Sequence, residues 1–194
     1  MSISVLDLFK TGVGPSSSHT VGPMRAAHDF VVELQLRTAL GAVRRIEVKL
    51  YGSLSATGVG HGTDRAVIAG LMGARPDEVD PDFLVEAVDA VRIDGELPLP
   101  GGVVVPFDWA RDMRLLPVSL PYHPNAMRLI AHGDAGVVYE NTYYSVGGGF
   151  VVDEAQTQSG APAEAELAVP YPFDTGAELL AQCRRHGIEK TPTR

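Results

Sequence analysis

Cysteine is nearly absent from this chain. Among its 194 residues only Cys183 carries a thiol, so no disulfide can form within the chain. Metal sites built from several cysteine thiolates are excluded by the same count. The six histidines do not replace them, because no His-Glu-x-x-His pattern or other standard zinc spacing occurs. We therefore expect no metal ligands in this chain.

Long apolar runs and basic runs are also missing. No stretch could span a bilayer, and the N-terminus lacks the charged and apolar regions of a signal peptide. The net charge of −8 repels a phosphate backbone. Neither a P-loop nor a Gly-x-Ser-x-Gly elbow occurs, so nucleotide and serine hydrolases have little support. The sequence predicts a cytoplasmic protein that binds neither membranes nor nucleic acids.

What is present is a mixed pattern of helices and strands, long enough for one large domain or two small ones. Helices are predicted over 21–40, in two pieces of 53–73 separated by the glycines of 58–62, from Asp80 to about Val91, and over 175–186. Strands are predicted over 43–50, 103–107, 127–132, 137–146 and 150–152, with the hairpin turn at 133–136. Turns or loops are expected over 5–9 (or a short helix), 97–102 and 154–166, and the tail 189–194 is expected to be disordered.

Three details of this pattern can be checked directly. Leu36 extends the apolar stripe of the helix predicted over 21–40, and Phe83 and Val85 belong to the apolar positions of the helix predicted from Asp80. Thr63 and Asp64 can cap the helix that follows them. The three glycines of 147–149 interrupt an apolar strand, which suggests a bulge or a close approach by another surface.

The most informative segment runs from Gly12 to Met24 and contains Ser16, Ser17, Ser18, His19 and Thr20. Its glycines, proline and hydroxyls stand immediately before a helix. Hydroxyls and free backbone N–H groups at the positive end of a helix can converge on an anion. The histidine adds a group that titrates near neutral pH. The alternative is a capping loop with a surface histidine, and the segment alone leaves both interpretations open.

A second histidine lies in a glycine-flanked turn. His61 has Gly60 and Gly62 as neighbours, followed by Thr63 and Asp64 at a predicted helix start. The glycines let a ligand approach the backbone closely. The simpler interpretation is a helix cap with a solvated histidine.

A third candidate enters a strand at Asn125, which follows His123 and Pro124. Here a plain turn, with Asn bonding its own backbone, is the better interpretation of the local sequence. His28 is expected on the surface or at an edge, and His132 and His186 are interpreted as structural or solvated.

At this point several blocks resemble one family. They occur in the family's order and span nearly the whole chain, namely 12–24, 50–58, 60–64, 142–151 and 169–173. Together they closely resemble the N-terminal β domain of bacterial iron–sulfur L-serine dehydratases. Two positions depart from it: many members carry Lys where Val59 stands, and Gly-Met often follows Asn where this chain has Ala126 and Met127.

The resemblance implies an α+β fold with a mixed, largely antiparallel sheet flanked by helices, similar to the allosteric substrate-binding domain of phosphoglycerate dehydrogenases. It also implies a reaction, the conversion of L-serine into pyruvate and ammonia at a [4Fe-4S] cluster. The family's cluster is held by cysteines of a second, α domain, which this chain does not contain. Residues 1–188 are therefore expected to form the β domain, with 189–194 as a tail or the start of a linker. The isolated chain is expected to be inactive.

The family's roles can be carried onto matching residues. His61 is the expected proton-transfer residue, with Thr63 and His19 beside it as the other catalytic candidates. The expected substrate-binding residues are Ser16, Ser17, Ser18, Thr20, Asp64 and, more weakly, Asn125. The expected partners are L-serine, the cysteine-bearing α domain and a second copy in a homodimer. Two alternatives remain open, a regulatory domain that senses an amino acid or small anion, and a scaffold that only mediates dimerisation.

Overall fold

A computed structural model describes residues 12–37, 39–159, 171, 173 and 175–187. Its main feature is a five-stranded sheet in the order β4-β1-β5-β6-β7. The strands are β1 (Arg45–Tyr51), β4 (Met113–Leu116), β5 (Asn125–Gly133), β6 (Gly136–Gly147) and β7 (Phe150–Asp153). β1 pairs with β4 in parallel, and the other neighbours are antiparallel. The predicted α+β class with a mixed, largely antiparallel sheet is confirmed.

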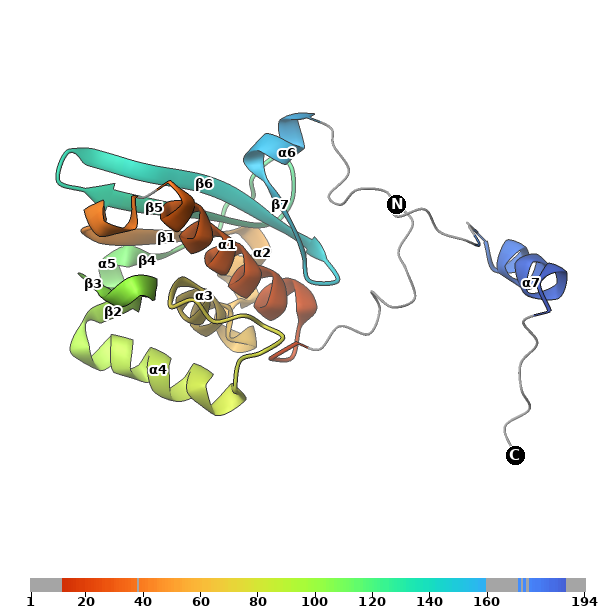
Figure 1. Cartoon of the computed structure of the whole chain (residues 1–194), viewed down its shortest axis with the longest axis horizontal. Helices are drawn as coiled ribbons and strands as arrows, with labels where there is room; N and C mark the ends of the chain where they lie inside the picture. Colours follow the sequence, from red (N-terminus) through yellow and green to blue (C-terminus); the bar gives the residue numbers. More distant parts are fainter. Residues whose placement is uncertain (1–11, 38, 160–170, 172, 174, 188–194) are drawn as a thin grey trace.

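Helices cover one face of this sheet (Figure 1). α1 (Gly22–Leu36) lies across it, α3 (Thr63–Leu71) packs on α1, and α4 (Pro81–Asp94) packs on α3. The core between the layers contains Phe30 and Leu34 of α1 and Ile46, Val48 and Leu50 of β1, all fully buried. No helix in the described part of the chain is both long and apolar enough to cross a membrane.

The remaining elements connect these layers. α2 (Gly52–Thr57) follows β1 directly, and the 3-10 turn Val59–His61 joins it to α3. A separate hairpin contains β2 (Glu96–Leu99) and β3 (Val103–Pro106), joined by the turn Pro100–Gly102. α5 (Trp109–Asp112) precedes β4, α6 (Glu154–Ser159) follows β7, and α7 (Gly176–Arg185) is the last helix.

The predicted helices and hairpin are largely confirmed. The β5–β6 hairpin turns between Gly133 and Gly136 as predicted. α7 begins after Thr175, whose side chain forms a capping box with Glu178. The glycines of 147–149 coincide with a register shift between β6 and β7, and the carbonyl of Gly149 accepts a hydrogen bond from Arg25. Both the bulge and the close approach therefore occur there.

The first long helix differs from its prediction at both ends. It starts earlier, with a π-turn over Ser17–Val21, and it ends at Leu36 instead of Leu40. Leu36 is 73% exposed, so continuing the helix gains no burial there. A 3-10 turn over Leu40–Ala42 instead brings Leu40 into the core before β1.

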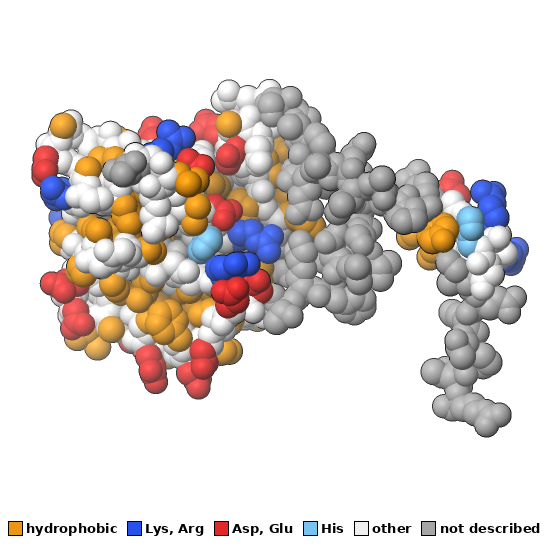
Figure 2. All heavy atoms as spheres, in the orientation of Figure 1, with side chains coloured by type: hydrophobic (Ala, Val, Ile, Leu, Met, Phe, Trp, Pro, Cys, Tyr) orange, Lys and Arg blue, Asp and Glu red, His pale blue; other side chains and the backbone are white. Residues whose placement is uncertain are grey.

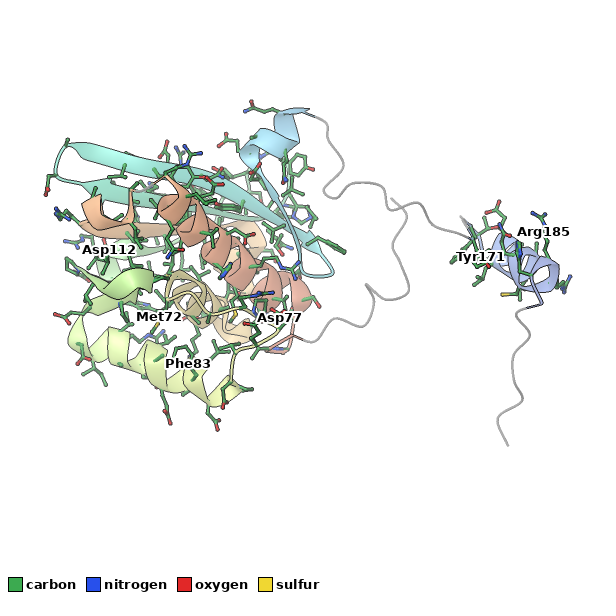
Figure 3. The ribbon with its side chains drawn as sticks, in the orientation of Figure 1. Met72, Asp77, Phe83, Asp112, Tyr171 and Arg185 are labelled. Carbon is green, nitrogen blue, oxygen red and sulfur yellow. The ribbon has the colours of Figure 1, made fainter. Side chains whose placement is uncertain are left out.

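The structure differs from the sequence pattern in three places in the middle of the chain. Only Pro100–Gly102 of the segment 97–102 is a turn; the rest belongs to β2, whose alternation of buried Leu97 and Leu99 with exposed neighbours was hidden by Pro98. In α4 the buried side chains are Leu84, Val88 and Val91, whereas Phe83 and Val85 are about 40% exposed. Figure 3 marks Phe83 beside α4, and Figure 2 shows hydrophobic patches over that part of the molecule. Strand β4, which runs along the edge of the sheet, had no prediction.

Two further predictions need correction. Residues 154–159 form α6 instead of a loop, because Asp153 and Gln156 exchange two side-chain-to-backbone hydrogen bonds at its start. Thr63 and Asp64 do not cap α3, since Gly62 precedes it in a left-handed conformation (φ 69°) without a side-chain cap. The predictions for 5–9, for the rest of the 154–166 loop and for the tail 189–194 lie outside the described residues.

Candidate active site

The two histidine-bearing segments lie side by side. The ring centroids of His19 and His61 are 5.0 Å apart. Two hydrogen bonds connect their backbones reciprocally: Thr20 Oγ1 donates to the carbonyl of His61 at 3.0 Å, and Thr63 Oγ1 donates to the carbonyl of His19. The expected neighbourhood of these segments is confirmed. The two threonine hydroxyls hold it together.

The serine segment starts the helix and also supports His19. Ser16 is the N-cap of the π-turn, and its Oγ accepts the backbone N–H of His19 at 3.3 Å. Ser18 Oγ lies 3.4 Å from Ser16 Oγ and 2.9 Å from His19 Nδ1. Ser17 is exposed. The same serines therefore cap the helix and support the histidine of the candidate site.

The imidazole of His19 is held on both sides. Its Nε2 lies 3.0 Å from Ser53 Oγ, and its Nδ1 faces Ser18. Burial is the main cause that lowers the pKa of His19, and the nearby His61 lowers it further. His19 is therefore neutral at neutral pH. Sequence reasoning did not select Ser53, the second residue of α2, because nothing in its local sequence indicates the contact with His19.

The orientation of His61 is fixed from its other side. Its Nδ1 lies 2.8 Å from the carbonyl oxygen of Thr57, at the end of α2. A carbonyl oxygen can only accept, so Nδ1 must carry a hydrogen. In the neutral ring the lone pair is then on Nε2, and none of the described residues bonds that nitrogen. His61 is partly exposed, and its Nε2 can accept a proton.

Thr63, Thr20 and Asp64 are buried and already paired. Thr63 is completely inaccessible and Thr20 is 3% exposed, and both hydroxyls are used between the two segments. Asp64 is 4% exposed, and its carboxylate accepts a hydrogen bond from Arg92 of α4 at 2.8 Å. The Arg92 guanidinium also lies 4.0 Å from the centroid of the Trp109 ring. These contacts give the three residues structural partners within the chain.

The third predicted segment, at Asn125 where β5 begins, contacts the start of α2 beside His19. Asn125 pairs with Gly52, and the carbonyl of Pro124 accepts the backbone N–H of Ser53. The side chain of Asn125 donates to the carbonyl of Ser145 at 3.4 Å. The turn bond here comes from His123, whose Nδ1 accepts the backbone N–H of Asn125 at 3.1 Å. Asn125 therefore lies beside Ser53, whose hydroxyl contacts His19.

Ser145 is a further residue that the sequence analysis did not select. It is 4% exposed, and among the described residues its Oγ is a buried side-chain polar atom without a hydrogen-bond partner. It packs on Gly22, where an added Cβ would lie 2.1 Å from that oxygen. The absence of a side chain at Gly22 therefore lets the start of α1 approach β6 closely.

A cavity of about 490 Å3 opens on the other side of the His61 turn. Thr20, His61, Asp64, Arg65 and Arg92 are the polar residues of its lining, and Val13, Pro15, Val59, Pro81, Leu84 and Val85 contribute apolar lining. Ser16, Ser18, His19, Ser53 and Asn125 do not line it. Val59, which is 57% exposed, adds apolar surface at this opening.

The residues of this chain do not fit a metal cluster. Cys183 is the only cysteine of the sequence, whereas an iron–sulfur cluster needs several thiolates. Within the described part of the chain, no three histidine, cysteine or acidic side chains are grouped so that they could hold a metal ion.

Comparison with known proteins shows the family of the chain. The family model described as serine dehydratase beta chain matches residues 4–156. L-serine dehydratase 1 of Escherichia coli (strain K12) is 46% identical over 189 residues, which cover 95% of this chain and 40% of the relative. The L-serine dehydratase of Streptomyces coelicolor is 46% identical over 190 residues, covering 97% of this chain and 42% of the relative.

A more distant relative, the L-serine dehydratase of Helicobacter pylori, is 38% identical over 186 residues. The chain spans about 40% of the length of these curated relatives. The match of the family model includes the serine segment with His19, the His61 turn and all strands through β7. The chain therefore belongs to the serine dehydratase beta chain family.

Proposed function

We propose that this chain is the β domain of an L-serine dehydratase, the enzyme that converts L-serine into pyruvate and ammonia. The observation that carries the proposal is the pairing of His19 and His61, 5.0 Å apart, at the start of a long helix. An imidazole whose Nε2 has no partner among the described residues and the positive end of a helix suit an amino-acid substrate, which has a Cα proton to lose and a carboxylate to bind. The names of the relatives support the same reaction.

In this proposal His61 is the base. Its Nε2 accepts the Cα proton of serine, while the Thr57 carbonyl holds Nδ1–H and stabilises the imidazolium that forms. The electron pair left on Cα forms the Cα–Cβ double bond as the Cβ–O bond breaks, and the hydroxyl leaves as water with the proton that His61 took up. The aminoacrylate product is then hydrolysed to pyruvate and ammonia. A water molecule is lost and regained, so the atoms balance.

The serine segment binds the substrate carboxylate. The N–H groups at the positive end of the helix, the exposed hydroxyl of Ser17 and the amide of Asn125 contact the carboxylate, while the hydroxyls of Ser16 and Ser18, which lie against each other and against the His19 ring, position these groups. Thr20, Thr63 and Asp64, which are buried and paired, hold these groups in place instead of contacting substrate. His19 stays neutral beside His61, so it does not repel the imidazolium that forms on His61 during the reaction.

The family's [4Fe-4S] cluster belongs to the proposal only as a group held by another domain. When bound, it supplies a Lewis acid for the leaving hydroxyl. The donor set of this chain does not hold it, and the proposal assigns its ligands to the cysteine-bearing α domain. Residues 1–188 as one β domain, a homodimer and a cytoplasmic location complete the proposal.

The test is anaerobic co-expression of this chain with the family's cysteine-bearing α domain, followed by a pyruvate assay with L-serine. We expect pyruvate from the pair and none from either part alone. The isolated chain should also stay colourless after reconstitution with iron and sulfide. Iron–sulfur absorbance with serine turnover by the isolated chain would contradict the proposal, as would a folded complex of both parts that makes no pyruvate.

The cavity behind His61 favours a second candidate, a domain that senses a small anion or amino acid. Arg65 lines that cavity, and none of the described residues forms an ion pair or hydrogen bond with it. A guanidinium without a partner among the described residues suits a carboxylate. Titration of the isolated chain with L-serine separates the candidates: a shift of the Arg65 side-chain signals without pyruvate from the co-expressed pair would favour sensing.

A further inference from the structure

Four side chains form one continuous chain of hydrogen bonds at the start of the helix. Ser16 Oγ lies 3.4 Å from Ser18 Oγ, which lies 2.9 Å from His19 Nδ1. On the other side of the ring, His19 Nε2 lies 3.0 Å from Ser53 Oγ. Two segments that are separated by 34 positions in the sequence are therefore connected through one imidazole.

Because the imidazole of His19 is neutral, the hydrogen bonds that connect these four side chains must all be donated in the same direction. One ring nitrogen carries a hydrogen and the other a lone pair, so one serine must donate to the ring and the other must accept from it. The lowered pKa of His19 keeps the ring in the neutral form to which this rule applies. The hydrogen bonds are therefore donated either from Ser16 toward Ser53 or from Ser53 toward Ser16.

The helix start favours the first direction. Free N–H groups and the positive end of the dipole attract the lone pairs of hydroxyls and repel their hydrogens. Ser16 already accepts the backbone N–H of His19. With its lone pairs toward the helix, Ser18 directs its hydrogen to His19 Nδ1. The ring then carries its own hydrogen on Nε2, toward Ser53.

We propose that Ser53 is a further residue of the site: its hydroxyl accepts the Nε2 hydrogen of His19 and presents its own hydrogen to the substrate carboxylate. Ser53 is partly exposed and lies next to Asn125, so it faces the same place as the other substrate-binding groups. Each donor in the chain polarises the next, which strengthens the last one. The contact to a carboxylate rests on the proposed function, whereas the direction of the chain does not.

The direction is tested on the 194-residue chain alone. Long-range proton–nitrogen NMR at pH 8 reports which nitrogen of His19 carries the hydrogen. We expect the Nε2–H form in the wild-type chain and a mixture of both forms in Ser53→Ala. Ser55→Ala, a substitution in the same short helix, is the matched control and should keep the Nε2–H form. Ser53→Thr retains the hydroxyl and should restore it.

Two NMR results would overturn the inference. One is the Nδ1–H form of His19 in the wild-type chain, which reverses the direction. The other is an unchanged His19 in a folded Ser53→Ala chain. If Ser53→Ala does not fold, the form seen in the wild-type chain and in Ser53→Thr still decides.

The substrate contact is tested in the co-expressed pair. Removing one hydrogen bond to a charged group should raise KM for L-serine about 10-fold or more in Ser53→Ala, with a smaller change in kcat. Ser55→Ala should leave both constants near those of the wild type. An unchanged KM in Ser53→Ala would remove the contact from the proposal. If the wild-type pair makes no pyruvate, the proposed function fails while the NMR result for His19 stands by itself.

Discussion

Arg92 of α4 reaches the buried carboxylate of Asp64 at the first turn of α3, with 2.8 Å between Nη2 and Oδ2. Asp64 comes three residues after His61, so this ion pair connects the outer helix to the segment that positions the histidine. The Asp64 side chain is 5% exposed and that of Arg92 37%. The pair therefore lies at the boundary between the core and the cavity.

Loss of this pair should destabilise the fold. Arg92→Ala leaves a buried carboxylate without its guanidinium, which costs about 1–3 kcal/mol of unfolding free energy, given the partial exposure of Arg92. Urea denaturation followed by circular dichroism measures it. Arg65→Ala is the matched control, because Arg65 lines the same cavity without a partner among the described residues; its effect should stay within about 0.5 kcal/mol. Equal stability of the two variants would contradict the assignment.

A second prediction concerns the close approach of α1 and β6. In Gly22→Ala the new methyl carbon would lie 2.1 Å from Ser145 Oγ and 3.0 Å from its Cβ. Overpacking of this kind costs about 1–3 kcal/mol, so the midpoint of urea denaturation should fall. Gly60→Ala is the control, since an added Cβ there meets no atom within 4 Å. Adding Ser145→Ala to Gly22→Ala should recover part of the loss, and an additive double variant would refute the contact.

Much of the fold could be predicted because its elements carry regular signals. The β5–β6 hairpin alternates and turns at Gly133–Gly136, and Thr175 caps α7 with Glu178 three residues later. β2 could not be predicted in the same way, because Pro98 is a turn signal in isolation and becomes an edge-strand residue only when β3 pairs with it. Tertiary pairing decided that element.

In the candidate site, too, some residues carry a local sequence signal and others are identified only by contacts across the fold. His19 and His61 were predictable because glycines and hydroxyls surround each of them in the sequence. Ser53 and Ser145 were not, since a serine after β1 or within β6 has no local signal for chemistry. Their significance comes from contacts across the fold, with His19 and Gly22 respectively. The similarity to the phosphoglycerate dehydrogenase domain stays a prediction.

The lowered pKa of His19 predicts that the stability of the fold depends on pH. The pKa of His19 is lowered in the folded chain, mainly by burial, relative to about 6.5 when unfolded. The unfolded state therefore binds more protons than the folded state once the pH falls below about 6.5. The contribution of His19 to the free energy of unfolding is complete above that pH and is lost on acidification. Buried Asp112, which Figure 3 marks near α5 and β4, has a lowered pKa despite its burial, because it accepts hydrogen bonds from Arg111, the backbone N–H of Asp108 and Arg45.

The measurement is the urea midpoint between pH 7.5 and 5, in the wild type and in His19→Gln. The wild type should lose stability more steeply below about pH 6.5, because the variant lacks the group whose pKa is lowered. Asp112 is ionised over this range in both chains, and its contribution is lost only at lower pH, below the ordinary range of an aspartate. Parallel curves for the two chains would contradict the prediction for His19.

The last prediction concerns catalysis by His61. In the co-expressed pair, His61→Ala should lower kcat about 100-fold or more, the usual scale for a lost acid–base group. The fold should change little, because His61 lies in a partly exposed turn and its Nδ1 contacts only a backbone carbonyl. His28→Ala is the control, a partly exposed histidine on α1 beside Asp29, and should retain wild-type turnover. Turnover by His61→Ala close to that of the wild type would transfer the role of base to another residue, with His19 the first to test, since its ring lies 5.0 Å away.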